Sequence, residues 1–150
     1  MQSQFAQVVI STDKSKLDLE SIYQFLSQES YWAKGIPYDV FSRSIEHSLC
    51  FGAYLGQLQV AFARVITDFA TYGYLADVFV LPEYRQQGIS KKLMEAVIAH
   101  PQLTGLRRIT LATSDAHGLY KQFEFRPLAK PEIFMELHRP NLYLRQASQA

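Results

Sequence analysis

The stretch ADVFVLPEYRQQGISKKL, residues 76–93, decides the fold of this chain. It begins inside an apolar run from Tyr74 to Leu81, which is typical of a central strand that is buried on both faces. Pro82 ends this strand because proline cannot donate to a sheet ladder. After Gly88, apolar residues recur up to Val97 at the spacing of one helical face. The stretch therefore predicts a buried strand, a tight loop and an amphipathic helix.

Further strands and helices are expected before and after this strand–loop–helix segment. In chain order we expect a strand over 5–10, helices over 19–26 and 38–48, strands over 49–55 and 58–66, and, beyond the quoted stretch, a strand over 108–113, a helix over 116–123 and a last strand over 134–137. Antiparallel hairpins then precede a βαβ crossover. We expect one mixed α/β (α+β-like) domain over 1–150, with about four helices, a core over about 5–138 and a frayed tail beyond Pro140.

The composition predicts a soluble, cytoplasmic protein. The chain has 150 residues, 48% of them hydrophobic and 19% charged, and its net charge is +1. These values are typical of an ordinary globular domain, and the charge offers no basic footprint for nucleic acid. No apolar run is long enough for a membrane span. Cys50 is the single cysteine, and the histidines show no ligand spacing, so we expect neither a disulfide nor a metal site.

The loop before the amphipathic helix has the composition of an anion site. The first N–H groups of a helix are unpaired and its dipole favours an anion. Gly88 lets a ligand approach the backbone, and Arg85 can add a charge-assisted contact. From spacing alone, a plain strand-to-helix turn with a solvated arginine explains the loop equally well.

Two segments resemble one known family. Arg85-Gln86-Gln87-Gly88-Ile89-Ser90 resembles the acyl-CoA signature of the GNAT superfamily of N-acetyltransferases, Arg/Gln-x-x-Gly-x-Gly/Ala. The segment AHGLYKQFEF, residues 116–125, is similar to the family's second block, and the order of elements also matches. The resemblance implies a central sheet that is splayed open between the strands at Tyr74–Leu81 and Arg108–Thr113. It also implies acetyl-CoA as co-substrate.

The resemblance assigns roles to individual positions. The residues implied to bind acetyl-CoA are Val78, Val80, Arg85, Gln86, Gln87, Gly88, Ile89, Ser90 and Thr113. Tyr120 falls where many members keep the acid that protonates the departing thiolate. Thr113 replaces a common asparagine, Ser90 replaces a second Gly/Ala, and Glu124 replaces a glycine that suits a left-handed helix end.

The residue that removes the proton from the acceptor amine is less clearly indicated by the sequence. Histone-type members carry a glutamate base at the position of Tyr74, and tyrosine is a poor base at neutral pH. Asp77 is a carboxylate inside an apolar strand, which marks either a functional group or an acceptor of structural hydrogen bonds. His117 lies three residues before Tyr120, where it relays a proton or is an ordinary surface histidine.

The acceptor side is expected at the aromatic corner of residues 31–37. The candidates there and nearby are Tyr31, Trp32, Arg43 and Tyr74, although a packed corner and a solvated arginine are the structural alternatives. We interpret the chain as an N-acetyltransferase that moves an acetyl group to the primary amine of a small metabolite, by direct attack in a ternary complex. The alternatives are a non-catalytic acyl-CoA sensor or scaffold and an enzyme that acts on a protein amine. The sequence does not determine the oligomeric state, but paired-strand dimers are common in the family, so the resemblance makes a homodimer possible.

Overall fold

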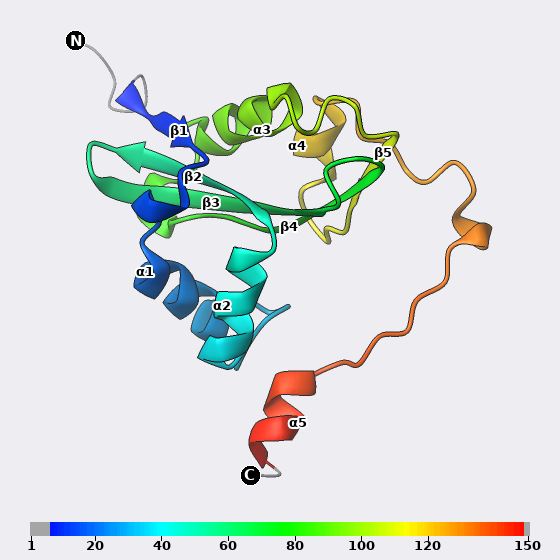
Figure 1. Ribbon diagram of the computed structural model, residues 1–150, viewed down its shortest axis with the longest axis horizontal. Coiled ribbons are helices and arrows are strands. Elements are labelled where there is room, and N and C mark those ends of the chain that lie inside the picture. Colours follow the sequence, from blue (N-terminus) through cyan, green and yellow to red (C-terminus); the bar gives the residue numbers. More distant parts are fainter. Residues whose placement is uncertain (1–6, 149–150) are drawn as a thin grey trace.

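A five-stranded sheet in the order β1-β2-β3-β4-β5 forms the centre of the computed structural model, which describes residues 7–148 (Figure 1). The strands are β1 (Val9–Ser11), β2 (Leu49–Leu55), β3 (Leu58–Thr67), β4 (Tyr72–Val80) and β5 (Arg108–Leu111). Neighbours from β1 to β4 are antiparallel, whereas β5 runs parallel to β4. The mixed α/β fold that the sequence predicts is therefore confirmed.

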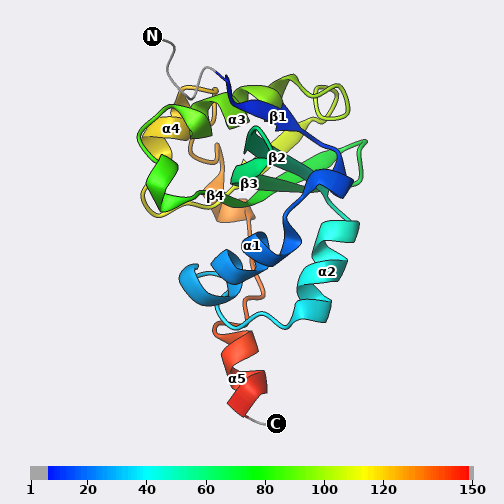
Figure 2. The same cartoon turned by 90° about the vertical axis from the view of Figure 1, so that its left-hand side faces the viewer.

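Helices cover both faces of the sheet. They are α1 (Leu19–Gln24), α2 (Tyr38–Glu46), α3 (Ile89–Ala99), α4 (His117–Lys121) and α5 (Leu142–Ser148), and a π-helical turn, η3 (Phe25–Glu29), continues α1. Figures 1 and 2 show α3 and α4 over one face, and α1 and α2 under the other. The amphipathic helix predicted after Gly88 is α3, and its apolar stripe faces the sheet.

Alternation along the strands builds a separate core on each face of the sheet. Ala61 and Ala63 of β3 point into the core under α3, while Phe62 between them points into the core of α1 and α2. In the second core, the rings of Phe25 and Phe79 stack at 4.0 Å between centroids. Cys50 is buried there, and burial raises the pKa of its thiol to about 11, as befits a small core residue.

The sheet splits between β4 and β5. Their pairing runs from Tyr72↔Arg108 to Leu75↔Leu111 and stops there. The next residues of β4 contain a bulge, because the register with β3 shifts between Phe62 and Arg64, and Asp77 has a φ of 55°. The side of β4 that faces β5 is consequently without a strand partner from Ala76 to Val80. The predicted splaying is confirmed.

The C-terminal part differs from expectation. The strand expected over 134–137 does not form, and this exposed segment pairs with none of the described strands. The prolines that flank it, Pro131 and Pro140, cannot donate to a sheet ladder. The residues beyond Pro140, expected to fray, form α5, since Leu142 and Tyr143 find partly buried positions. The first strand begins at Val9, and the part of it expected before residue 7 lies outside the described residues.

Candidate functional site

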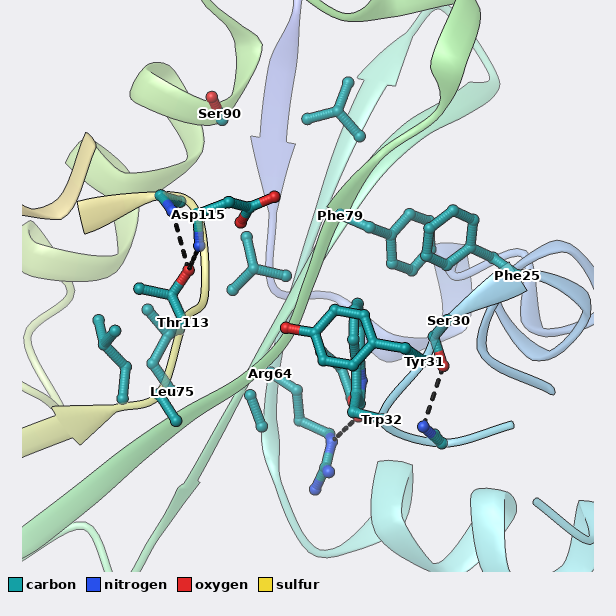
Figure 3. Close-up of a pocket in the computed structure, with 18 of the residues that line it drawn as sticks. Phe25, Ser30, Tyr31, Trp32, Arg64, Leu75, Phe79, Ser90, Thr113 and Asp115 are labelled. Atoms are coloured by element: carbon teal, nitrogen blue, oxygen red, sulfur yellow. Dashed lines mark hydrogen bonds and ion pairs between the residues drawn. The ribbon is translucent and has the colours of Figure 1, made fainter. Parts of the chain in front are cut away.

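The split between β4 and β5 opens into a cleft of about 1030 Å³. Its walls come from η3 and the following loop, α2, β3, β4, the loop before α3, the segment from Leu111 to Tyr120, and Tyr143 of α5. Figure 3 shows Thr113 and Asp115 on one side of β4, and Tyr31 and Trp32 on the other. A ligand that follows β4 through the cleft therefore meets the loop before α3 at one end and the aromatic corner at the other.

The loop before α3 is shaped as an anion cradle. Gln86 and Gly88 both have left-handed backbone, with φ of 64° and 79°. A Cβ at Gly88 would meet no atom within 4 Å, so the space above its backbone is open to a ligand. No side chain caps α3, and its first intrahelical bond is from the Lys92 amide to the Gly88 carbonyl. Amides of the first turn are thus free to bind phosphate oxygens.

Most of the residues predicted to bind acetyl-CoA around this cradle line the cleft. Arg85 and Ser90 line the cleft, together with Gln86, Gly88 and Ile89, while Gln87 does not. The Nε of Arg85 donates to the carbonyl of Val80 at 2.9 Å, which ties the loop to the end of β4. Val78 and Val80 also line the cleft on the unpaired side of the sheet split. The segment thus combines an open, uncapped helix start with a strand edge that an extended ligand arm can pair with.

Asp77 lies at the bulge of β4 with both carboxylate oxygens occupied. Oδ2 accepts from Nε of Arg64 at 2.8 Å, and Oδ1 accepts from Nε1 of Trp32 at 2.7 Å. Arg64 also donates through Nη1 to Ser48 Oγ at 2.9 Å. The ion pair is largely buried, with 13% of the Arg64 side chain and 9% of the Asp77 side chain exposed. This geometry corresponds to the structural alternative for Asp77, since both carboxylate oxygens already accept hydrogen bonds from neighbouring side chains.

Tyr120 faces the same cleft from α4. It is 8% exposed, its ring packs edge-on against Phe125 at 5.9 Å, and its hydroxyl makes no hydrogen bond to another described residue. Burial raises the pKa of Tyr120, and the nearby charge of Asp115 adds to the effect. The hydroxyl is therefore protonated at neutral pH, as a proton donor must be.

Two other predicted residues of this side have different surroundings. The hydroxyl of Thr113 accepts from the amides of Ala116 at 3.0 Å and Asp115 at 3.4 Å, so it holds the turn that leads into α4 while lining the cleft. His117 is exposed and does not line the cleft. It lies on the outer side of α4, in keeping with a surface histidine.

The aromatic corner closes the opposite end of the cleft. Tyr31 and Trp32 pack edge-to-face with centroids 5.0 Å apart. The Tyr31 hydroxyl reaches across to Ser114, where the two oxygens lie 3.2 Å apart, and Figure 3 shows the ring in front of β4. Tyr74 also lines this end, and burial raises its pKa, which supports its interpretation as a poor base. Arg43 is exposed and lies outside the lining, with its Nε on the Asp39 carbonyl.

Sequence reasoning missed Arg64, Glu29 and Tyr143, which also line the cleft. Arg64 carried a usable signal, because it is a lone charge inside an otherwise apolar run of β3. Among residues 7–148 no group of histidine, cysteine or carboxylate side chains could hold a metal ion. None of the helices in this range is long and apolar enough to cross a membrane.

Comparisons with known proteins assign the family. The model of the acetyltransferase (GNAT) domain matches residues 46–127, which include β2 to β5 and the cradle. The Gibberella zeae protein FG08082, named as an acetyltransferase, is 31% identical over 134 residues, with 75% of each chain covered. A Xanthomonas campestris protein assigned to the GNAT family has a crystal structure with 57% identity and a TM-score of 0.88, over 91% of this chain and 96% of that one.

A more distant structure, from Clostridium acetobutylicum, was solved with acetyl-CoA and shares the fold, with 18% identity and a TM-score of 0.62 over 87% of this chain and 94% of that one. The family match, the identity to FG08082 and the open cleft beside an anion cradle agree with one another. The chain belongs to the GNAT family and is an acetyl-CoA-dependent acetyltransferase.

Proposed function

We propose that this enzyme transfers the acetyl group of acetyl-CoA to the primary amine of a small metabolite, by direct attack in a ternary complex. The observation that carries the proposal is the unpaired side of β4 from Ala76 to Val80. It runs from the cradle at Gly88 to the aromatic corner at Trp32, with the Tyr120 hydroxyl in the same cleft. One continuous cleft thus offers a donor site, a reaction centre and an acceptor site.

The donor half would be held mainly by backbone groups. The amides from Gln86 to Ser90 would bind the pyrophosphate, and the backbone of Val78 and Val80 would pair with the pantetheine arm as an added strand. A β4 N–H that faces the thioester carbonyl would stabilise the negative charge that develops on its oxygen. The open space above Gly88 supports this fit, since a side chain there would occupy the approach to the amides.

In the chemical step the neutral acceptor nitrogen attacks the thioester carbon, and the carbon–sulfur bond breaks as Tyr120 donates a proton to the sulfur. The proton that the attacking nitrogen loses on becoming an amide returns through water to the Tyr120 phenolate. The amine must attack in its neutral form, although an alkyl ammonium has a pKa of about 10.4. Asp77 is paired with Arg64 and Trp32, and the pKa of Tyr74 is raised, so neither side chain is a ready base. We therefore assign the loss of the amine proton to a water path through the open cleft.

The acceptor end favours a compact molecule. Tyr31 and Trp32 offer two aromatic faces, and the Tyr31 contact with Ser114 narrows the cleft between them and α4. An aromatic pocket of limited width suits a free amine better than a lysine on a folded protein surface. The net charge of +1 likewise provides no footprint for a nucleic acid.

The same proposal includes a homodimer. β5 is an edge strand with β4 as its only strand neighbour among the described residues. The segment after η5 (Pro131–Ile133) contacts β5, since Arg108 lies over the ring of Phe134 at 5.3 Å. In it Met135 and Leu137 expose 96 and 75% of their surface, and Ile133 at the end of the 3-10 turn exposes 63%. A second copy would cover both the strand edge and these side chains. Light scattering of the full chain should give twice the 17.2 kDa mass, and a monomer at micromolar concentration would contradict it.

An amine panel tests the function. The purified protein is incubated with acetyl-CoA and single amines, amino acids or a folded lysine-rich protein, and free CoA thiol is measured. Release with a small amine, abolished in a cradle variant, supports the proposal. A non-catalytic sensor would bind acetyl-CoA in calorimetry and release no thiol with any acceptor. Release with the folded protein alone would assign the enzyme to protein amines.

A further inference from the structure

A second cavity, of about 470 Å³, lies behind the aromatic corner. One of its walls is the segment from Glu29 to Trp32, which is at the same time a wall of the main cleft. The other wall is the C-terminal segment from His138 to Leu144, which includes the start of α5. Figure 2 shows α5 beyond α1 and α2, at the end of that lobe away from the sheet. The two cavities therefore share a border, formed by the segment from Glu29 to Trp32 and by Tyr143.

Packing holds α5 against this loop. Tyr143 is partly buried against the core of α1 and α2, and it lines both cavities. Leu144 lies so close to Gly35 that a Cβ there would be 3.0 Å from its Cδ2 atom. Gly35 has a φ of 81°, and its amide donates to the Ser27 carbonyl at 2.8 Å, so the backbone at the contact is fixed. The second cavity is thus a built feature of the lobe.

The charges in the second cavity are mainly positive. Lys34, His138 and Arg139 line it, and none of the three has a hydrogen bond or an ion pair with another described residue. Glu29 is the single acidic residue of the lining, and it lies at the border with the main cleft. In the cleft itself, Asp77 and Arg64 neutralise each other. A molecule that lies in both cavities would meet the acid at their shared border and the cations Lys34 and Arg139 in the second cavity.

We propose that the second cavity binds the anionic end, a carboxylate or a phosphate, of the acceptor whose amine is acetylated in the main cleft. This inference rests on the proposed function and names the acceptor class: a primary amine with a negatively charged group at the other end. Lysine and arginine side chains bind such groups through charge-assisted hydrogen bonds, with arginine able to form two at once. Glu29 at the border is placed to favour the cationic amine over the anionic end.

The test compares acceptors that share the amine and differ at the far end. A ladder of ω-aminocarboxylates of increasing length is compared with the matching amides, and ω-aminoalkyl phosphates are compared with the matching alcohols. Binding is measured by calorimetry in the presence of CoA, and acetylation by thiol release. We expect at least one length at which the anion binds about tenfold more tightly than its neutral partner, which corresponds to one charge-assisted contact. The two series distinguish a carboxylate from a phosphate.

Variants locate the effect. Arg139→Gln and Lys34→Gln should each reduce the preference for the anion by about threefold, because each removes one of the two cations that together give the tenfold preference. Lys130→Gln is the matched control, since Lys130 is an equally exposed cation outside both cavities. It should leave the preference unchanged.

The results separate this inference from the function on which it rests. Thiol release with equal use of anions and neutral partners at every length would overturn the anion site and leave the acetyltransferase proposal intact. A preference that survives both cavity variants, or that falls equally in Lys130→Gln, would also overturn it. Anion-selective binding without thiol release would keep the second cavity as an anion site and refute the proposed transfer.

Discussion

Replacing Asp77 by asparagine separates the two interpretations of this carboxylate. The substitution keeps the size of the side chain and tolerates the left-handed backbone, where φ is 55°. It removes the negative charge that Arg64 faces, while one amide oxygen can still accept from Trp32 or from Arg64. The perturbation is therefore one of charge, with little change in shape.

The expected cost follows from burial. The Arg64 and Asp77 side chains are 13% and 9% exposed, so solvent screens the pair little. Leaving one charge of a buried pair uncompensated costs about 3–5 kcal/mol. The hydrogen bond from Arg64 to Ser48 and the retained amide oxygen offset part of this cost. We expect Asp77→Asn to lower the free energy of unfolding by about 3 kcal/mol, and the Tm by about 9 °C for a domain of this size.

Urea unfolding measures the loss of stability and steady-state kinetics measure the effect on catalysis, both at a temperature well below thermal unfolding. If Asp77 positions Trp32 and compensates Arg64, stability falls and the acceptor KM rises, while kcat stays within about tenfold of wild type. Arg64→Met should destabilise by a similar amount, and the double variant should lose less than the sum, since the partner charge is then absent. Unchanged stability with a kcat lowered by 10²-fold or more would refute this reasoning and assign Asp77 as the base.

Four further substitutions probe the cradle, the acid, the acceptor wall and one helix end. Gly88→Glu should abolish acetyl-CoA binding in calorimetry while the domain stays folded, because the added carboxylate enters open space at the cradle. Gly88→Ala, with the same φ of 79°, is the control for backbone strain and for the Cβ alone, and it should bind more weakly than wild type but still measurably. Tyr120→Phe should lower kcat by roughly 10²–10⁴ with little change in acetyl-CoA affinity, and a fully active variant would exclude Tyr120 as the acid. Since burial raises the pKa of Tyr120, the rate of the wild-type enzyme should fall only above about pH 10. Trp32→Ala should raise the acceptor KM strongly and leave the acetyl-CoA KM within about twofold, and an equal rise in both would contradict an acceptor role. Glu124→Gly should raise the free energy of unfolding by about 1 kcal/mol, because Glu124 lies with a φ of 70° in the turn that follows α4. A loss of stability in thermal unfolding would contradict this reason.

The sequence predicted those elements whose signals are local. The strands expected over 49–55 and 58–66 form the hairpin of β2 and β3, with its turn at Gly56, where φ is 60°. The apolar stripe from Ile89 to Val97 faces the sheet as expected. The left-handed backbone at Glu124 was also predictable, because a family glycine is replaced at a helix end. In each case the residues that carry the signal are within about ten positions of one another, so periodicity and turn chemistry suffice.

The chemistry of the cleft depended on contacts that no local pattern encodes. Asp77 meets Arg64 because the bulge in β4 shifts its register with β3, and a shift of one residue turns a side chain to the opposite face. Tyr143 reaches the same cleft from the far end of the chain, after a segment without regular pairing. The position of Tyr143 depends on the space that Gly35 leaves for Leu144, and the sequence around a loop glycine does not predict which side chain packs against it. The proposed donor half of the site is built from one strand, one loop and one helix in sequence, whereas the proposed acceptor half is assembled from η3, β3, β4 and α5. A site that the backbone of one continuous segment forms can be found from its sequence, but acceptor specificity here is a property of the tertiary contacts.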